Sequence, residues 1–288
     1  IRDCRADYLV VVAYGRILPP EVLEAARFGA LNIHPSLLPR HRGPAPVPWT
    51  LWHGDPVTGV TIMQMNEFMD AGDIVRQIET PVQPDENADE LLHRLAVAGT
   101  RELLDVLARE EAGNRLPRTP QDPSRATTAP LLTTEMAWVD WDAGAQTVAN
   151  RIRAFDSKPG AYTFLSDVRL KVFRPAVLEN AEGEPGSVLG TDAGRLVVAC
   201  AQGAVALGEL QWPGSRRMPA AHVLAGHPIP DESSVEGARK IVEIARKARK
   251  GDIVFFSESG GGSAPTSWNL ASDRDFTTSG RILWKSVS

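Results

Sequence analysis

The chain has 288 residues, a formal net charge of −5 at pH 7, 43% hydrophobic residues and 23% charged residues. These values fit a globular protein with one large or two medium domains, and they exclude a chain-wide basic surface for nucleic acid. Only Cys4 and Cys200 occur, which excludes a disulfide scaffold and a cysteine-built metal site and suits a reducing cytoplasm. The sequence contains no signal-peptide pattern and no apolar run of membrane-spanning length.

The first part of the chain alternates predicted strands and helices. A continuous apolar run over residues 8–13 predicts a buried parallel strand. The residues after it turn at Gly15, which serves either as a simple turn or as a backbone edge that grips a ligand. The other elements are expected as helices at 21–27 and 49–53 and strands at 30–34, 58–65 and 74–81.

A long amphipathic helix follows the capping residues 85–87. Its apolar positions are expected to pack into the core, namely Leu91, Leu92, Leu95, Val97, Leu103, Leu104 and Leu107.

The stretch from Ala30 to Asp73 holds the residue types of an active site. Asn32 and His34 are two residues apart on a predicted strand, so their side chains share one side of the sheet. A proline-rich loop follows, and Asp70 then supplies a carboxylate on a second loop. An amide and an imidazole can stabilise an oxyanion, and a nearby carboxylate is expected to raise the histidine pKa so that the ring is charged near pH 7. A lone histidine at a strand end is also compatible with a structural role, in which it satisfies a turn carbonyl.

The second part of the chain begins after a proline-, serine- and threonine-rich stretch over residues 117–130, which predicts a linker. A helix is predicted at 145–155. Five short strands are predicted after it, at 161–165, 170–173, 186–189, 196–200 and 205–210, and they suggest a small β-barrel of the oligonucleotide-binding type. This part is locally basic, which indicates either an RNA-binding face or a solvated surface.

With these residues placed, residues 1 to about 226 resemble the methionyl-tRNA formyltransferases. Asn32-x-His34-x-Ser36-Leu37-Leu38-Pro39 followed by Asp70-x-Gly72 resembles the signature of the formyl-tetrahydrofolate transferases. The run 58–65 is close to the form typical of the tRNA enzymes. The second part adds Pro159-Gly160-Ala161-Tyr162 and Gln211-x-x-Gly214-x-x-x-Met218, which are similar to the C-terminal barrel of that family.

The resemblance implies an α/β fold, with a partial formyltransferase Rossmann-like parallel sheet followed by a small OB-like β-barrel. We expect a catalytic domain at 1–116, a linker at 117–132 and a tRNA-binding domain at 133–226. The family's amino-terminal strands do not occur in this sequence, so we expect the sheet to lack the strands beside residues 8–13. Residues 227–288 are similar to part of a glycerate 2-kinase with a glycine-rich loop, and we interpret them as a foreign or misassembled tail with no phosphate-binding role.

The resemblance also implies the reaction, in which a formyl group passes from 10-formyltetrahydrofolate to the amine of methionyl initiator tRNA. The catalytic residues would be Asn32, His34 and Asp70, without a metal. The folate-binding residues would be Tyr14, Gly15, Arg16, Ile17, Leu18, Ser36, Leu37, Leu38, Pro39, Asn66, Glu67, Phe68 and Met69. The tRNA-binding residues would be Arg40, Arg42, Arg151, Arg153, Lys171, Arg216 and Arg217. The complete enzyme is expected to be a cytoplasmic monomer.

Two alternatives share these features. A sister formyltransferase acting on the amine of a sugar nucleotide would carry the same Asn-His-Asp set. A non-catalytic RNA-binding remnant would keep a working barrel beside an inert catalytic part. A kinase would rest on the tail alone and would require ATP binding.

Overall fold

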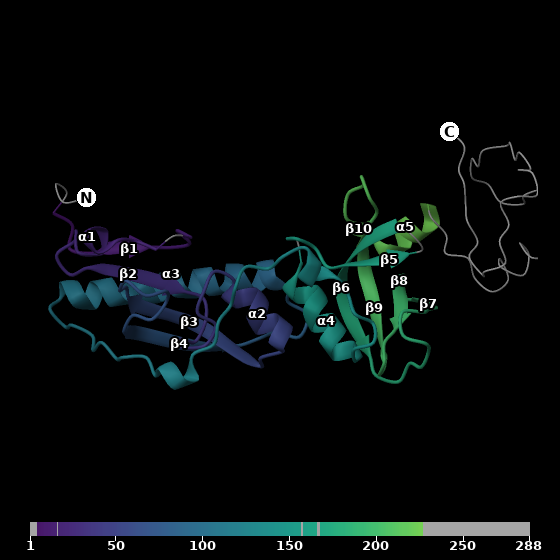
Figure 1. Cartoon of the computed structure of the whole chain (residues 1–288), viewed down its shortest axis with the longest axis horizontal. Helices are drawn as coiled ribbons and strands as arrows, with labels where there is room; N and C mark the ends of the chain where they lie inside the picture. The colour runs from purple at the N-terminus through teal and green to yellow at the C-terminus, as the bar shows by residue number, and fades with distance from the viewer. Residues whose placement is uncertain (1–4, 16, 157, 166–167, 227–288) are drawn as a thin grey trace, which may run out of the picture. The chain divides into compact units, whose positions relative to one another are not determined.

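The computed structural model describes residues 5–15, 17–156, 158–165 and 168–226 (Figure 1). The chain forms two compact units, residues 1–229 and 230–288, and all described residues belong to the first. The predicted tail at 227–288 and the predicted folate contact Arg16 lie outside the described residues.

The first sheet has four strands in the spatial order β1-β2-β3-β4. Their bounds are Leu9–Val11, Ala30–His34, Val57–Gln64 and Ile74–Pro81. β1 and β2 are parallel, as expected, whereas β3 runs antiparallel to both β2 and β4. The connection from β3 to β4 is short, and a short connection can join only antiparallel neighbours. The short helices are α1 (Pro20–Leu23) and α2 (Pro46–His53).

Helix α3 (Ala88–Glu111) covers one face of this sheet. Its N-terminus is closed by a capping box, in which the Asn87 side chain accepts from the Glu90 N–H and the Glu90 carboxylate accepts from the Asn87 N–H. Gly99 lets the helix approach the sheet, because a Cβ there would lie 2.6 Å from Ile33 Cγ2 and 3.0 Å from Val60 Cγ1.

The expected core face of α3 was partly wrong. Leu92, Val97 and Leu104 are exposed. The buried stripe instead runs through Ala88, Leu91, Leu95, Gly99, Leu103 and Val106. Successive helical positions turn by about 100°, so a leucine beside a core position points away from the sheet.

The second sheet is antiparallel, with β10 (Met218–Pro219) pairing β9 outside the main path. Its strands in order are β5 (Tyr162–Leu165), β6 (Val168–Leu178), β9 (Ala204–Gln211), β8 (Arg195–Ala199) and β7 (Val188–Asp192). The sheet curls into a barrel-like form, which confirms the predicted mixed α/β fold with a β-barrel-like second part. The remaining elements are η2 (Pro123–Arg125), η3 (Glu135–Ala137), α4 (Ala145–Ala154) and α5 (Ala220–Gly226).

The two sheets share one hydrophobic core, which α2 and α4 connect. Trp52 of α2 packs edge-on against Phe155, with ring centroids 5.1 Å apart. Phe155 is completely buried, in the same cluster as Leu51 and Ile152. Because large apolar side chains from both halves fill this cluster, the halves stabilise each other.

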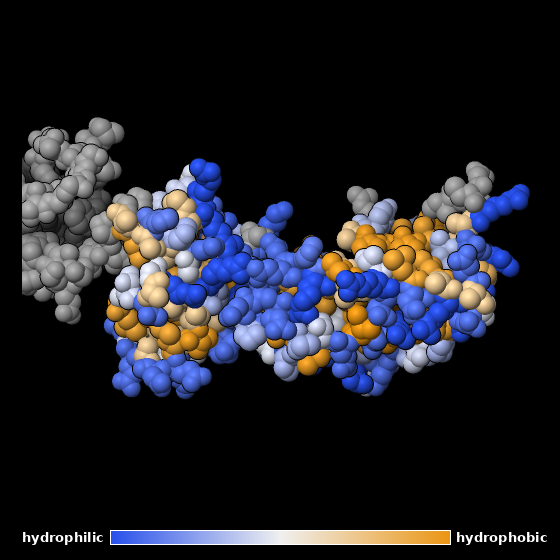
Figure 2. All heavy atoms as spheres, turned by 180° about the vertical axis from the view of Figure 1, so that it is seen from behind, coloured by the Kyte–Doolittle hydropathy of each residue, from blue (hydrophilic) through white to orange (hydrophobic). Residues whose placement is uncertain are grey.

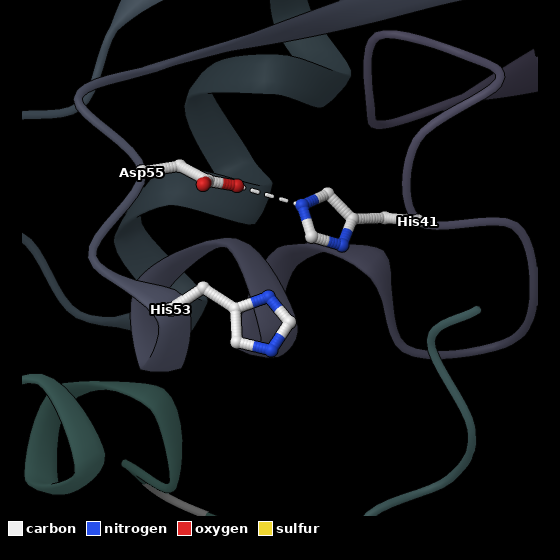
Figure 3. A group of neighbouring side chains, drawn as sticks. All are labelled: His41, His53 and Asp55. Atoms are coloured by element: carbon white, nitrogen blue, oxygen red, sulfur yellow. Dashed lines mark hydrogen bonds and ion pairs between the residues drawn. The ribbon is translucent and has the colours of Figure 1, made fainter. Parts of the chain in front are cut away.

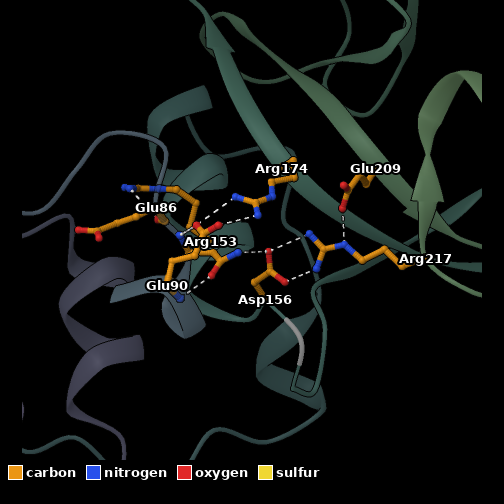
Figure 4. Close-up of polar contacts among 8 residues, drawn as sticks. Glu86, Glu90, Arg153, Asp156, Arg174, Glu209 and Arg217 are labelled. Atoms are coloured by element: carbon orange, nitrogen blue, oxygen red, sulfur yellow. Dashed lines mark hydrogen bonds and ion pairs between the residues drawn. The ribbon is translucent and has the colours of Figure 1, made fainter. Parts of the chain in front are cut away.

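A polar network also joins the two parts (Figure 4). The buried Asp156 carboxylate accepts from Arg217 and from Asn87 Nδ2, and Arg217 also pairs with Glu209. Arg174 donates to both carboxylate oxygens of Glu90 at the start of α3, at 2.6 and 3.0 Å.

Substitution of Arg217 by Ala is expected to destabilise the fold, because it leaves the Asp156 charge buried without its cation. The free energy of unfolding should fall by about 3 kcal/mol, as is usual when one partner of a buried pair is removed. Arg216→Ala is the matched control, since Arg216 is exposed and loses the same charge. Urea unfolding measures both, and equal midpoints for the two variants would contradict this role.

Candidate active site

Strand β2 presents Asn32 and His34 on the sheet face opposite α3. Ile33, between them, points to the helix and contacts the position of Gly99. His34 lies opposite Thr61 of β3, and the Thr61 hydroxyl donates to the Ser36 carbonyl at 2.7 Å and accepts from the Leu38 N–H at 3.1 Å. This strand pair therefore fixes both the imidazole and the loop that follows it.

The two nitrogens of His34 have different partners. Nε2 lies 2.9 Å from the His41 carbonyl oxygen, and a carbonyl only accepts, so Nε2 carries the proton. Nδ1 faces Asp70 Oδ1 at 3.7 Å. In the neutral ring Nδ1 is then an acceptor that faces a second acceptor. His34 thus combines the structural role of a strand-end histidine with a position close to Asp70.

Asp70 is held in a fixed and unusual backbone conformation. Its φ is +49°, in the left-handed region that few non-glycine residues occupy. Its Oδ2 accepts from the Gly43 N–H at 2.8 Å, which leaves Oδ1 toward His34. Two positions further on, a Cβ on Gly72 would lie 1.8 Å from the Gln64 carbonyl oxygen, so only glycine fits there.

The expected charge of His34 needs correction. Burial lowers the pKa of His34 below its usual value, and this outweighs the opposite effect of the Asp70 carboxylate. The side chain is only 5% exposed, so the charged ring loses most of its hydration. Asp70 does act to raise the pKa of His34, as predicted, but burial lowers it more, so His34 is neutral near pH 7.

Acid should therefore destabilise the folded chain through its buried histidines. Burial lowers the pKa of both His34 and His41 below the ordinary value of 6.5, so the unfolded state binds more protons. Through these histidines, stability should change little between about pH 6.5 and pH 7 and should fall as the pH drops below about 6.5. The carboxyls of Glu90 and Glu110 also have a lowered pKa, but they change the stability only when the pH falls below their ordinary pKa of 4.5.

Urea midpoints measured between about pH 7 and pH 5 test this acid effect. The urea midpoint should depend less on pH in His34→Gln, because glutamine keeps a donor for the His41 carbonyl but does not titrate. A midpoint that stays constant over this range in the unmodified chain would contradict the expectation.

The predicted folate-binding residues divide into buried and exposed groups. Leu18 and Leu38 are buried, and Ser36 shapes its own loop by donating to the Arg40 carbonyl at 2.7 Å. The exposed group lies on the loops after β1 and β3 and includes Tyr14, Gly15, Ile17, Asn66, Glu67, Phe68 and Met69. Figure 2 shows apolar side chains both over the part of the molecule that holds the first sheet and over the part that holds the second.

The predicted tRNA contacts need two corrections. Arg153 is buried, and its guanidinium donates to the carbonyls of residues 83, 84 and 86 and to Asn150, so it joins the two parts instead of meeting solvent. Arg217 is occupied by Asp156 and Glu209.

The other predicted basic contacts keep some exposure. Arg216 is exposed. Arg151 lies over the Trp52 ring at 4.9 Å. Lys171 donates to the Pro159 carbonyl at 2.8 Å, and Arg42 donates to Gln121. Arg40 is 49% exposed and pairs with Asp55.

His41, His53 and Asp55 form a cluster beside the site, with one ligand atom of each within 4.8 Å of the others (Figure 3). Asp55 Oδ2 lies 2.7 Å from His41 Nε2, and Asp55 Oδ1 accepts from Arg40 Nη2 at 2.8 Å. The guanidinium neutralises the carboxylate charge that would attract a cation. The cluster instead holds His41, whose φ is +59° and whose carbonyl accepts from His34.

Comparison with known proteins identifies the class to which this fold and site belong. Residues 1–107 match the family model described as formyl transferase, and residues 131–228 match the formyl transferase C-terminal domain. Residues 186–271 also match a domain of unknown function, DUF4147. Among the described residues, no helix is both long enough and apolar enough to cross a membrane.

Curated relatives narrow this class. The methionyl-tRNA formyltransferase of Syntrophus aciditrophicus is 45% identical over 225 residues, which cover 77% of this chain and 72% of the relative. The methionyl-tRNA formyltransferase of Aromatoleum aromaticum is 43% identical over 237 residues, which cover 82% of this chain and 74% of that relative. The chain therefore belongs to the methionyl-tRNA formyltransferase family, and it is a formyltransferase.

Solved structures agree with this fold. HypX from Aquifex aeolicus in complex with tetrahydrofolic acid is 26% identical with a TM-score of 0.60, and the match covers 76% of this chain and 38% of HypX. Methionyl-tRNA formyltransferase from Clostridium thermocellum has a TM-score of 0.50 at 18% identity, covering 61% of this chain and 74% of that protein.

Proposed function

We propose that this chain transfers the formyl group of 10-formyltetrahydrofolate to the α-amino group of methionine on initiator tRNA. The observation that carries the proposal is the pair of acceptors, His34 Nδ1 and Asp70 Oδ1, 3.7 Å apart beside Asn32. Two facing acceptors favour an N–H donor between them, and the attacking amine is such a donor. Residues 1–116 would catalyse the reaction, residues 117–132 would link, and residues 133–226 would hold the tRNA.

The reaction needs one proton to move from the amine to the leaving nitrogen. As the amine attacks the formyl carbon, a C–N bond forms and the carbonyl oxygen gains negative charge. The Asn32 amide would donate to that oxygen, while His34 Nδ1 takes the amine proton and Asp70 stabilises the resulting imidazolium. The proton would then pass to the folate nitrogen as its bond to carbon breaks, which restores neutral His34.

Folate recognition is supported by the residues near these groups. The loop after β1 begins next to Asn32, because Val11 pairs with Asn32 in the sheet. Ile17 on this segment and Phe68 on the loop after β3 are 67% and 66% exposed, and large exposed apolar side chains suit an aromatic pterin. A structural relative at 26% identity binds tetrahydrofolic acid.

The tRNA would be held mainly through its phosphates. Among the predicted contacts Arg40 and Arg216 are exposed, and Arg151 and Lys171 are partly exposed. Arg153 is buried, whereas Arg42 and Arg217 are partly exposed but donate to Gln121 and to Asp156 and Glu209. Phosphate contacts release counterions, so tRNA affinity should fall steeply with salt.

Replacement of Asn32 by Ala should slow formyl transfer by about 100-fold, because it removes a preorganised donor to the developing oxyanion. The Asn32 amide has no side-chain partner among the described residues, so its loss should leave the fold intact. The effect should appear in kcat more than in the folate KM. Asn114→Ala, at an exposed position away from the site, is the control, and equal rates for the two variants would remove Asn32 from the mechanism.

A direct assay tests the proposed function. The purified chain is given 10-formyltetrahydrofolate with either methionyl initiator tRNA or an amino-sugar nucleotide, and formylated product is quantified. We expect transfer to the tRNA. Transfer to the sugar nucleotide alone would show that the chain is a sugar formyltransferase and not a tRNA formyltransferase. Binding of tRNA without any transfer would support a non-catalytic RNA-binding remnant.

A further inference from the structure

The segment expected to be a linker is bound along the catalytic part. Thr119 and Ile74 exchange both backbone hydrogen bonds, at 2.8 and 2.9 Å. The Arg42 N–H donates to the Thr127 carbonyl at 2.8 Å, and the Ala129 N–H donates to the Arg42 carbonyl at 2.7 Å. Trp49 Nε1 donates to the Pro130 carbonyl at 2.8 Å. Residues 119–130 therefore form a strap across the loops that carry the site.

Gln121 is the side chain through which this strap reaches Asp70. Its Nε2 donates to the carbonyl oxygens of Asp70 and Gly72, at 2.8 and 2.7 Å. Its Oε1 accepts from Nε and Nη2 of Arg42, at 3.1 and 2.7 Å. Only one orientation of the amide satisfies two carbonyls at one end and a guanidinium at the other, so these roles are unambiguous.

We propose that Gln121 is a positioning residue that holds the Asp70 loop in its catalytic conformation. The proposal rests on the proposed function of Asp70. Left-handed backbone at a non-glycine residue persists only where the surroundings impose it. At Asp70 the Gly43 N–H holds the carboxylate, and Gln121 holds the backbone carbonyls of residues 70 and 72.

Arg42 has a supporting part in this arrangement. It occupies the acceptor end of the Gln121 amide, and its own backbone bonds to residues 127 and 129 of the strap. Arg42 was predicted to contact tRNA, and the structure directs its side chain to Gln121. Gly43 thus holds the Asp70 carboxylate, and Gln121, which Arg42 holds in turn, holds the Asp70 backbone carbonyl.

Gln121→Met tests the proposal, because methionine has a similar length without hydrogen-bonding groups. We expect kcat to fall about 10- to 100-fold, as for a small misplacement of a catalytic group, with less change in KM. Gln202→Met is the matched control, at an exposed glutamine of the second part. Thermal unfolding of each variant separates lost rate from lost fold.

A double-mutant cycle shows whether Gln121 acts through Asp70. In an Asp70→Asn background, Gln121→Met should cause no further loss of rate. Additive losses would overturn the proposal, as would an unchanged rate in Gln121→Met or a rate loss fully accounted for by unfolding.

The pKa of His34 gives a readout that does not depend on formyl transfer. Asp70 raises the pKa of His34 against the effect of burial, so displacement of Asp70 should lower it further. The pKa is measured by NMR titration of the ring in the unmodified chain, in Gln121→Met and in Gln202→Met. An unchanged value in Gln121→Met overturns the positioning role, whereas an absence of transfer in the unmodified chain overturns only the proposed function.

Discussion

Replacing His34 by Ala is expected to reduce formyl transfer by about 10²- to 10⁴-fold, the contribution usual for a positioned acid–base group. In the proposed reaction the neutral ring offers Nδ1 as the acceptor for the amine proton, and no other described side chain pairs with Asp70 from that side. Alanine removes the acceptor and leaves the His41 carbonyl without its donor. The rate is measured at saturating folate and tRNA, so that binding does not limit it.

His34→Gln is a second variant that tests the same role if His34→Ala does not fold. Glutamine can still donate to the His41 carbonyl but cannot accept and release the amine proton, so we expect a folded chain with a similar loss of rate. His93→Ala, at an exposed histidine of α3, is the control. Near-full activity in a folded His34→Gln chain would show that another group moves the proton.

Asp70→Asn is expected to lower the rate by a comparable amount, about 10²- to 10⁴-fold. The amide has the shape of the carboxylate, and its oxygen can still accept from the Gly43 N–H, so the loop should keep its conformation. It lacks the negative charge that stabilises a protonated His34, and the pKa of His34 should therefore fall further below 6.5. Activity assays and NMR titration of His34 measure the two effects.

Asp73→Asn is the matched control for charge, because Asp73 lies on the same loop and its backbone carbonyl, not its side chain, accepts from the Gln64 N–H. It should keep the rate of the unmodified chain. If Asp70→Asn lowered the rate without lowering the pKa of His34, the proposed coupling of the two side chains would be wrong.

Most local elements of the fold could be predicted from the sequence. The strands 30–34 and 74–81 agree with β2 and β4, and the predicted cap of the long helix is confirmed at Asn87. These elements depend on patterns within a few residues, such as apolar runs, prolines and capping groups. The exposed face of α3 was misjudged because every leucine was assigned to the core, although helical geometry buries only one stripe.

The candidate site was predicted in part. Asn32 and His34 share a strand, so their common face follows from the sequence. The approach of Asp70 to His34 was predicted from the place of Asp70 on a loop that follows a later strand, and the structure places the two groups 3.7 Å apart. The roles of Arg153 and Gln121 could not be predicted, because their partners are distant in the sequence. The carbonyls that Arg153 contacts lie 67 to 70 residues away. The partners of Gln121 lie 49 to 79 residues away.

The sequence by itself determined which chemical groups are available: an amide and an imidazole on one strand, a carboxylate on a following loop, and the family that carries them. Only the tertiary structure decided the protonation and the hydrogen-bond partners of these groups. Burial makes His34 neutral, its Nε2–H donates a hydrogen bond to the His41 carbonyl, and the segment expected to be a linker is a strap whose Gln121 donates to the Asp70 carbonyl. Desolvation and long-range hydrogen bonds depend on what packs around a residue, and no local pattern contains that information.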